Sequence, residues 1–139
     1  MTEKEKMNEL YAKYGLSPED VFKHQHYKII TRSGIDKIQA KLGIEIDYEL
    51  IYSNRWSEGL DIIFKVVATM GDKTIVTMGE ASPSNTRQAY IASMAEKRGM
   101  SRAVLKLAGL YAEGFFGEDE ADSFGDTVKT AKKVAIIKS

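Results

Sequence analysis

Apolar residues recur at helical spacing in three stretches of the chain. The stretches are residues 3–14, 33–42 and 86–111. Side chains three and four positions apart lie on one face of a helix, so each stretch predicts an amphipathic helix. Ser33 is expected to cap the second helix, and glycines follow all three. Between the first two helices, Ser17-Pro18 predicts a short helical turn and residues 26–31 a short strand.

A period of two replaces the helical period after the second helix. In residues 44–52, apolar side chains alternate with acidic ones, which is typical of a strand with one buried face. The alternation predicts that Tyr48 and Tyr52 pack in the core. Residues 53–59, which include Arg55 and Trp56, are polar and predict a loop.

Two further apolar runs predict a hairpin before the third helix. They are residues 60–70 and 73–80, and Gly71-Asp72 between them is a turn signal. The order of elements predicts an α+β fold, in which a three-stranded antiparallel β-meander is packed by a long C-terminal helix. The length of 139 residues fits one domain, which we assign to residues 1–116. Residues 117–139, acidic and then basic, predict a flexible tail.

Signals for catalysis are weak throughout the chain. There is no cysteine, which excludes zinc fingers and thiol nucleophiles. His24 and His26 lack a nearby carboxylate pair, and the acidic run at residues 118–122 lacks calcium-loop spacing, so it is expected to be solvated. We therefore expect a protein that is not an enzyme and carries no metal or cofactor. The N-terminus shows neither a signal peptide nor a membrane span, so we expect a cytoplasmic protein.

The distribution of charge favours a polyanionic partner, although the sequence is neutral overall. Twenty basic residues balance twenty acidic ones. However, basic residues predominate in residues 23–41 and 85–107, whereas residues 113–126 contain acids and no base. A phosphate backbone responds to the local field rather than to the net charge. The competing interpretation is that these charges are simply solvated.

The third helix carries the strongest candidate site. Arg98, Arg102 and Lys106 are spaced four apart and lie along one side, beside a line of small residues that would let a sheet approach closely. The small residues are Ala92, Ala95, Gly99 and Ala103. We predict that the basic row binds phosphates. The alternative is that the arginines pair with the acidic residues 118–122 of the same chain.

Other residues complete the predicted nucleic-acid site. Lys97 and Arg87 add positive charge along the same helix, and Arg32 adds it from the basic segment 23–41. Trp56 beside Arg55 would offer a surface on which bases stack, and the alternative for Trp56 is a core or subunit contact.

These residues resemble a known family. Residues 95–104, Ala-Glu-Lys-Arg-Gly-Met-Ser-Arg-Ala-Val, are similar to the signature helix of phage single-strand annealing proteins of the Erf/Sak type, relatives of the eukaryotic single-strand annealing mediator. Residues 30–43 are similar to the strand and helix that precede the meander in that family. The resemblance covers about residues 26–112. It implies a β-β-β-α core, a site arginine at Arg102, and Ser101 where some members have lysine.

The function that the resemblance implies is single-stranded DNA binding. We expect coating, with strand annealing as a further activity, in phage recombination or replication inside a bacterial host, by a ring-shaped or helical homo-oligomer. Two alternatives stay open. A double-stranded RNA-binding domain has the same element order but usually a lysine cluster at the start of its second helix. A structural assembly protein would oligomerise without nucleic acid.

Overall fold

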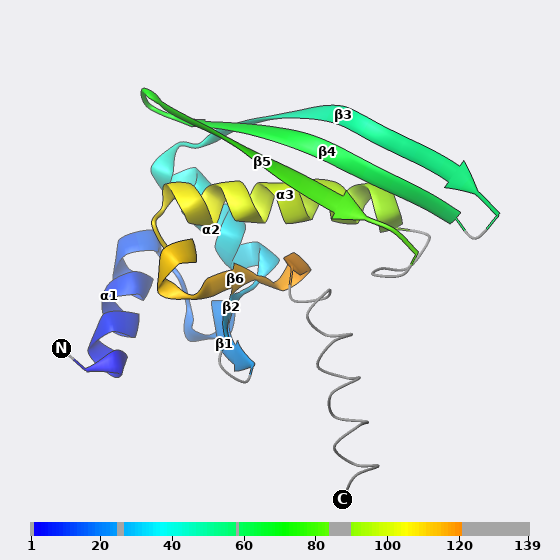
Figure 1. Cartoon of the computed structure of the whole chain (residues 1–139). Coiled ribbons are helices and arrows are strands. Elements are labelled where there is room, and N and C mark those ends of the chain that lie inside the picture. Colours follow the sequence, from blue (N-terminus) through cyan, green and yellow to red (C-terminus); the bar gives the residue numbers. More distant parts are fainter. Residues whose placement is uncertain (1, 25–26, 58, 84–89, 121–139) are drawn as a thin grey trace, which may run out of the picture.

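The protein has an α+β fold in which a three-stranded antiparallel sheet packs against a helix. The computed structural model describes residues 2–24, 27–57, 59–83 and 90–120. The sheet forms a curved layer above helix α3 (Ile91–Leu107), as Figure 1 shows. The expected fold class is therefore confirmed. No helix within the described ranges has the length and apolar character needed to span a membrane.

The large sheet is a meander with strand order β3-β4-β5. Its strands are β3 (Glu45–Trp56), β4 (Gly59–Met70) and β5 (Lys73–Ala81). Gly71, in the predicted turn between β4 and β5, has φ of 63°, a value that glycine adopts without strain. The last two strands therefore form the hairpin that the sequence predicts.

The close approach of sheet and helix that the small residues predict is present. A Cβ atom added to Gly79 of β5 would lie 2.6 Å from the backbone nitrogen of Gly99 and against the backbone of Ala95. Thr77 donates a hydrogen bond from Oγ1 to the Gly99 carbonyl oxygen, 2.7 Å away. Ala92, at the start of the predicted line, is exposed. The packing of α3 on β5 thus depends on glycines facing each other.

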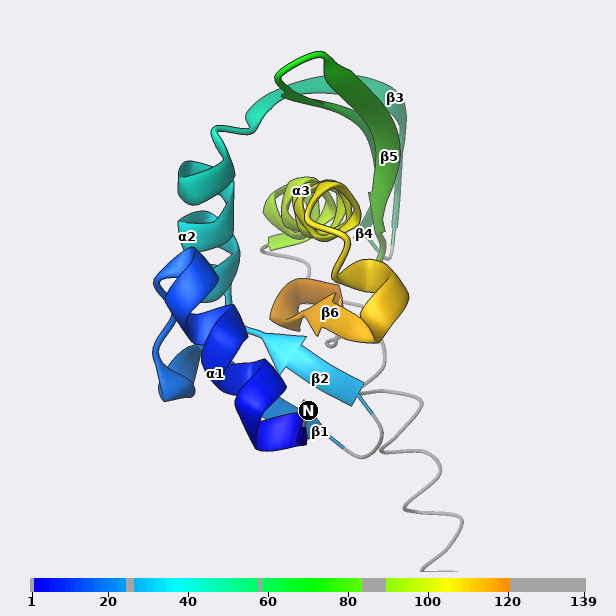
Figure 2. The ribbon, with the colours of Figure 1, turned by 90° about the vertical axis from the view of Figure 1, so that its left-hand side faces the viewer.

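The N-terminal helices lie on the opposite side of α3 from the sheet. They are α1 (Glu3–Tyr14), the 3-10 turn η1 (Pro18–Asp20) and α2 (Arg32–Leu42). Figure 2 shows α3 surrounded by the large sheet, α2 and a second, smaller sheet. The apolar core between these layers includes Ile35 and Ile38 of α2 and Val104 of α3, all fully buried.

The cap of α2 differs from the prediction. Thr31, rather than Ser33, is the N-cap residue, and its side chain accepts a hydrogen bond from the backbone N–H of Gly34 at 3.1 Å. The helix begins two residues earlier than the apolar pattern indicates because Thr31 keeps an extended backbone and satisfies an otherwise unpaired donor.

A second sheet was not predicted. It contains β1 (Val21–His24), β2 (Tyr27–Ile30) and β6 (Phe115–Gly117), and β6 follows the short 3-10 turn η3 (Tyr111–Glu113). β2 pairs antiparallel with β1 and parallel with β6, which joins segments from the two ends of the chain. The predicted strand at residues 26–31 corresponds to β2. β1 and β6 are not predicted, because both are short and β6 lies far along the sequence.

The end of the domain also lies later than predicted. Gly117 is the last residue of β6, and Asp119 and Glu120 beyond it are buried. The fold therefore extends at least to Glu120, past the boundary that we place at residue 116. Residues 121–139, the rest of the expected tail, lie outside the described residues.

The last helix is shorter than predicted. It ends at Leu107 because Gly109 has φ of 75° and the N–H of Leu110 turns back to the Leu105 carbonyl, a pattern that terminates helices. The pattern of apolar residues predicts instead that the helix continues to residue 111. The predicted start at residue 86 lies outside the described residues.

β3 differs most from the prediction. The strand continues through Trp56, so Arg55 and Trp56 lie in a strand and not in a loop. Tyr48 and Tyr52 are both exposed rather than packed in the core. α3 packs beneath β4 and β5, which leaves β3 partly uncovered, and a bulge at Ile51 moves Tyr52 to the other face.

Candidate nucleic-acid interface

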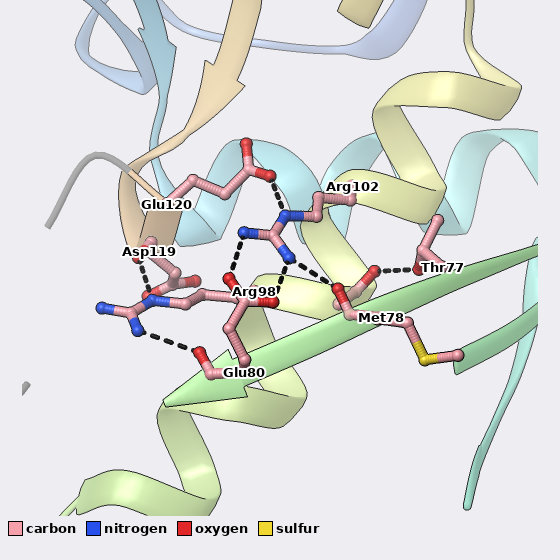
Figure 3. Close-up of polar contacts among 8 residues, drawn as sticks. Thr77, Met78, Glu80, Arg98, Arg102, Asp119 and Glu120 are labelled. Atoms are coloured by element: carbon pink, nitrogen blue, oxygen red, sulfur yellow. Dashed lines mark hydrogen bonds and ion pairs between the residues drawn. The ribbon is translucent and has the colours of Figure 1, made fainter. Parts of the chain in front are cut away.

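Arg102 is held by two carboxylates and a carbonyl. Its Nη1 and Nη2 donate to the Glu80 carboxylate at 2.7 and 2.8 Å. Its Nε donates to Oε1 of Glu120 at 2.6 Å, and Nη1 also donates to the Met78 carbonyl oxygen at 2.6 Å. Figure 3 shows the guanidinium pointing at the end of β5, between the two carboxylates. The donors of Arg102 that would face a phosphate are thus engaged within the fold.

Arg98 is fully buried, one turn before Arg102. Its Nε donates to the backbone carbonyl oxygen of Asp119 and its Nη1 to that of Glu80, both at 3.0 Å. The carbonyl groups of Met78 and Glu80 point outward from the free edge of β5. The two arginines therefore occupy the place at this edge that a neighbouring strand would otherwise take (Figure 3).

The electrostatics of the cluster follow from its burial. The hydrogen bonds from Arg102 hold the pKa of Glu80 below its ordinary value, although partial burial acts in the opposite direction. Burial raises the pKa of Glu120, and the charge of Arg102 only partly offsets that effect. The hydrogen bonds to Glu80 raise the pKa of Arg102, which keeps the guanidinium charged. The result is a partly buried ion-pair network in which the Glu80 side chain, about half exposed, is the most accessible to solvent.

Arg32 joins the same cluster from α2. Its backbone N–H donates to Oε1 of Glu118 at 2.9 Å, and its Nη1 lies 3.7 Å from a carboxylate oxygen of Asp119. Its Nε lies 3.3 Å from Asp36, one helical turn further along. Residues 118–120, which follow β6, thus lie close to positive charge from two helices. Asp119 and Glu120 are buried, whereas the acidic run was expected to be solvated, and residues 121 and 122 of that run lie outside the described residues.

Three of the predicted site residues therefore converge, but on the C-terminal end of the described chain. Arg32, Arg98 and Arg102 all contact residues 118–120. This is the intramolecular pairing that the sequence leaves open as the alternative to phosphate binding. The sequence does not predict Glu80 as a partner of Arg102, because Glu80 lies on the outer face of β5 and its carboxylate reaches the guanidinium around the edge of the sheet.

The remaining basic residues of the predicted site lie apart from this cluster. Lys106 is exposed, and its Nζ lies 5.7 Å from the centre of the Tyr111 ring. Lys97 is partly exposed and forms no ion pair with a described residue. Arg87 lies outside the described residues. Among the described basic residues of α3, Lys97 and Lys106 are therefore accessible to solvent, whereas Arg98 and Arg102 are held within the fold.

Arg55 lies on a second surface, the face of β3 that looks toward α3. Its cross-strand partner is Leu60, which packs against the core, so Arg55 lies on the inner face of the sheet. Tyr48 and Leu50, opposite Val66 and Phe64 respectively, share that face. Arg55 is exposed and forms no ion pair with a described residue. Trp56 is the last residue of this strand.

Charged groups from both neighbouring helices act on Tyr48. Partial burial raises the pKa of its hydroxyl, and the charge of Arg32 acts in the opposite direction. Glu96 of α3 and Asp36 of α2 add to the upward shift. The inner face of β3 thus lies within the electrostatic influence of charged groups on both helices, and Arg55 is the cation on the strand itself.

Neither metal chemistry nor a known relative offers another assignment for these surfaces. Within the described residues, no cluster of three His, Cys, Asp or Glu side chains has an arrangement that could hold a metal ion. No protein-family model matches the chain, and no curated protein is similar to it in sequence.

Proposed function

We propose that the protein binds single-stranded DNA without sequence preference, as a non-enzymatic coating protein, and that the inner face of β3 is the contact surface. The observation that carries the proposal is the exposure of Tyr48 and Leu50 on the same face as Arg55. Proteins that bind single strands combine aromatic rings, on which bases stack, with basic side chains that hold the phosphates. Tyr48 offers the ring, and Arg55 offers a guanidinium that forms no ion pair with a described residue.

This proposal moves the contact surface away from the arginines of α3. Arg98 and Arg102 have their donors on carbonyl and carboxylate oxygens, and displacing those partners would leave Glu120 buried without its cation. Lys97 and Lys106 remain available for phosphates, although they are nine positions apart and so lie on opposite sides of the helix. Arg98 and Arg102 instead stabilise the fold, because they hold α3 against β5.

Fluorescence anisotropy with a labelled oligo-dT strand tests the proposal. We expect binding that weakens as salt rises, because contacts with phosphates release counterions. Replacing Tyr48 with alanine should raise the Kd about 5- to 150-fold, the range for loss of one stacked base. Arg55→Ala should reduce the slope of log Kd against log salt by about 0.7, the loss of one phosphate contact.

The control is Val76→Ser. Val76 is as exposed as Leu50 but lies on the outer face of β5, so the Kd should not change. Absence of salt-dependent binding to oligo-dT would refute the function, as would tighter binding to duplex RNA. Unchanged affinity in both the Tyr48 and Arg55 variants would refute the surface.

A further inference from the structure

The small sheet carries apolar residues on both of its faces. Val21, Ile30 and Phe115 belong to the main apolar core, so the face on which they lie packs against the rest of the domain (Figure 2). Side chains of successive residues in a strand point to opposite faces, and partners in register share a face. The other face, which we call the distal face, therefore holds four large apolar or aromatic residues. They are Phe22, Tyr27, Ile29 and Phe116.

Ile29, at the centre of the distal face, is fully buried. Its cross-strand neighbour on that face, Phe22, is 44% exposed, so the face is open to solvent at β1. Ile29 belongs to neither of the two apolar clusters of the described chain, whereas Ile30, on the opposite face, is part of the main one. A side chain on a sheet face that is left in water keeps part of its surface exposed. Complete burial of Ile29 therefore requires a further group above it.

Aromatic rings gather beside Ile29 on this face. The rings of Tyr27 and Phe116 meet edge to face, with centroids 5.3 Å apart and an interplanar angle of 85°. The ring of Tyr111, in η3, meets the Phe116 ring at 5.2 Å and 69°. Aromatic rings favour such edge-to-face neighbours, and each buried ring removes a large apolar surface from water. The distal face is therefore suited to an aromatic side chain.

The chain itself supplies such a side chain. β6 belongs to this sheet and ends at Gly117, and the described residues end at Glu120. Phe124 follows four positions later and is the only aromatic residue after Phe116. Four residues span up to about 14 Å, so a chain that turns back after Glu120 can bring Phe124 to the Phe116 ring. A segment on so short a tether has an effective concentration in the millimolar range, well above that of a second copy.

We propose that residues 121–128 fold back over the distal face and that the side chain of Phe124 covers Ile29. The occupant of this face is thus a segment of the same chain, rather than a second copy or another protein. Docking at Phe124 fixes the chain after residues 118–120, and β6 fixes it before them. The docked segment therefore helps to keep residues 118–120 on the arginines of α3.

The rate at which iodoacetamide alkylates a single introduced cysteine, in the full chain, measures this cover. The chain contains no cysteine, so Ile29→Cys places the only thiol on the distal face and Ile30→Cys places it in the main core. Both thiols should react slowly, because both positions are fully buried. Adding Phe124→Ser should accelerate alkylation at Ile29→Cys at least tenfold more than at Ile30→Cys, since it uncovers the distal face alone.

Ile137→Ser is the matched control, because it removes an apolar side chain elsewhere in the C-terminal sequence and should leave both rates unchanged. Circular dichroism should show that every variant is folded. An unchanged rate at Ile29→Cys after Phe124→Ser, equal acceleration at Ile29→Cys and Ile30→Cys, or an equal effect of Ile137→Ser would overturn the proposal. So would a rate at Ile29→Cys that falls as protein concentration rises, because a second copy would then supply the cover. None of these results depends on whether DNA binds.

Discussion

The Nε of Arg102 lies 2.6 Å from a carboxylate oxygen of Glu120, whose side chain is 1% exposed. Removal of the guanidinium would leave that carboxylate buried without its cation. We expect Arg102→Ala to reduce the free energy of unfolding by about 3–5 kcal/mol, the usual cost of breaking a buried ion pair from one side. Urea denaturation measures the loss.

The matched control for this substitution is Arg55→Ala. Arg55 is exposed and unpaired with described residues, so its replacement should change stability by no more than about 0.5 kcal/mol. Glu120→Gln in the Arg102→Ala background should recover part of the loss, because the buried charge is then absent. Additive losses in that double variant would contradict the pairing.

The contact between Gly79 and Gly99 yields a second prediction. A Cβ at position 79 would meet the backbone of α3, which cannot move as a side chain can. Gly79→Ala should therefore destabilise the fold by about 1–3 kcal/mol through overpacking. Thermal unfolding followed by circular dichroism measures the change. Ala92→Ser, on the exposed side of α3, should leave the melting temperature nearly unchanged, and equal effects of the two would refute the close approach.

Local patterns in the sequence were sufficient to predict the large sheet and its helix. The strands, the hairpin at Gly71 and the line of small residues on α3 all depend on side chains close in sequence. Of the short sheet, the sequence predicts β2 alone: β1 has only four residues, and β6 pairs with β2 from a distant part of the chain. The exposure of Tyr48 could not be predicted either, since a period of two identifies a strand but not how far a helix covers it.

The candidate site was predictable in part. The pattern correctly grouped Arg98 and Arg102 on one side of a helix, but it could not distinguish a phosphate from a carboxylate of the same chain as their partner. Residues 118–120 reach these arginines only because β6 pairs with β2 and turns the chain back across α3.

The start of α2 provides a third prediction. Thr31 accepts a hydrogen bond from the N–H of Gly34, whereas Ser33 lies inside the helix. Thr31→Ala should cost about 1 kcal/mol, as is typical for loss of an N-cap. Ser33→Ala is the matched control and should be neutral or slightly stabilising, because alanine favours helix interiors. Chemical denaturation of both variants compares them, and a larger loss for Ser33→Ala would identify Ser33 as the cap.

Asp20 should make stability depend on pH in the acid range. A hydrogen bond from Lys37 at 2.7 Å, and then one from the N–H of Ser17 at 2.8 Å, hold the pKa of Asp20 below its ordinary value of 3.8. The folded state therefore binds this proton more weakly than the unfolded state. Its contribution is fully present above pH 3.8 and is lost as pH falls through the lower pKa of the folded protein.

The Asp20→Asn variant measures this contribution. It should be less stable than wild type at pH 7, by about 1–3 kcal/mol, and the difference should shrink as pH falls below 3.8. Asp47→Asn, at an exposed carboxylate of β3, is the control and should change the free energy of unfolding at pH 7 by no more than about 0.5 kcal/mol. A difference between Asp20→Asn and wild type that stays constant down to pH 2 would contradict the assignment.

Ser101 connects the family resemblance to the packing of β6. The Ser101 side chain is fully buried, and a Cβ added to Gly117 would lie 2.7 Å from the Cβ of Ser101, so the two residues are in close contact. A lysine at position 101, which the resemblance to annealing proteins would allow, would be forced against β6. We expect Ser101→Lys to be destabilised by more than about 2 kcal/mol, whereas Lys97→Ser on the exposed side of α3 should be nearly neutral. Urea denaturation compares the two. A stable Ser101→Lys protein with increased affinity for oligo-dT would instead indicate that position 101 faces the DNA.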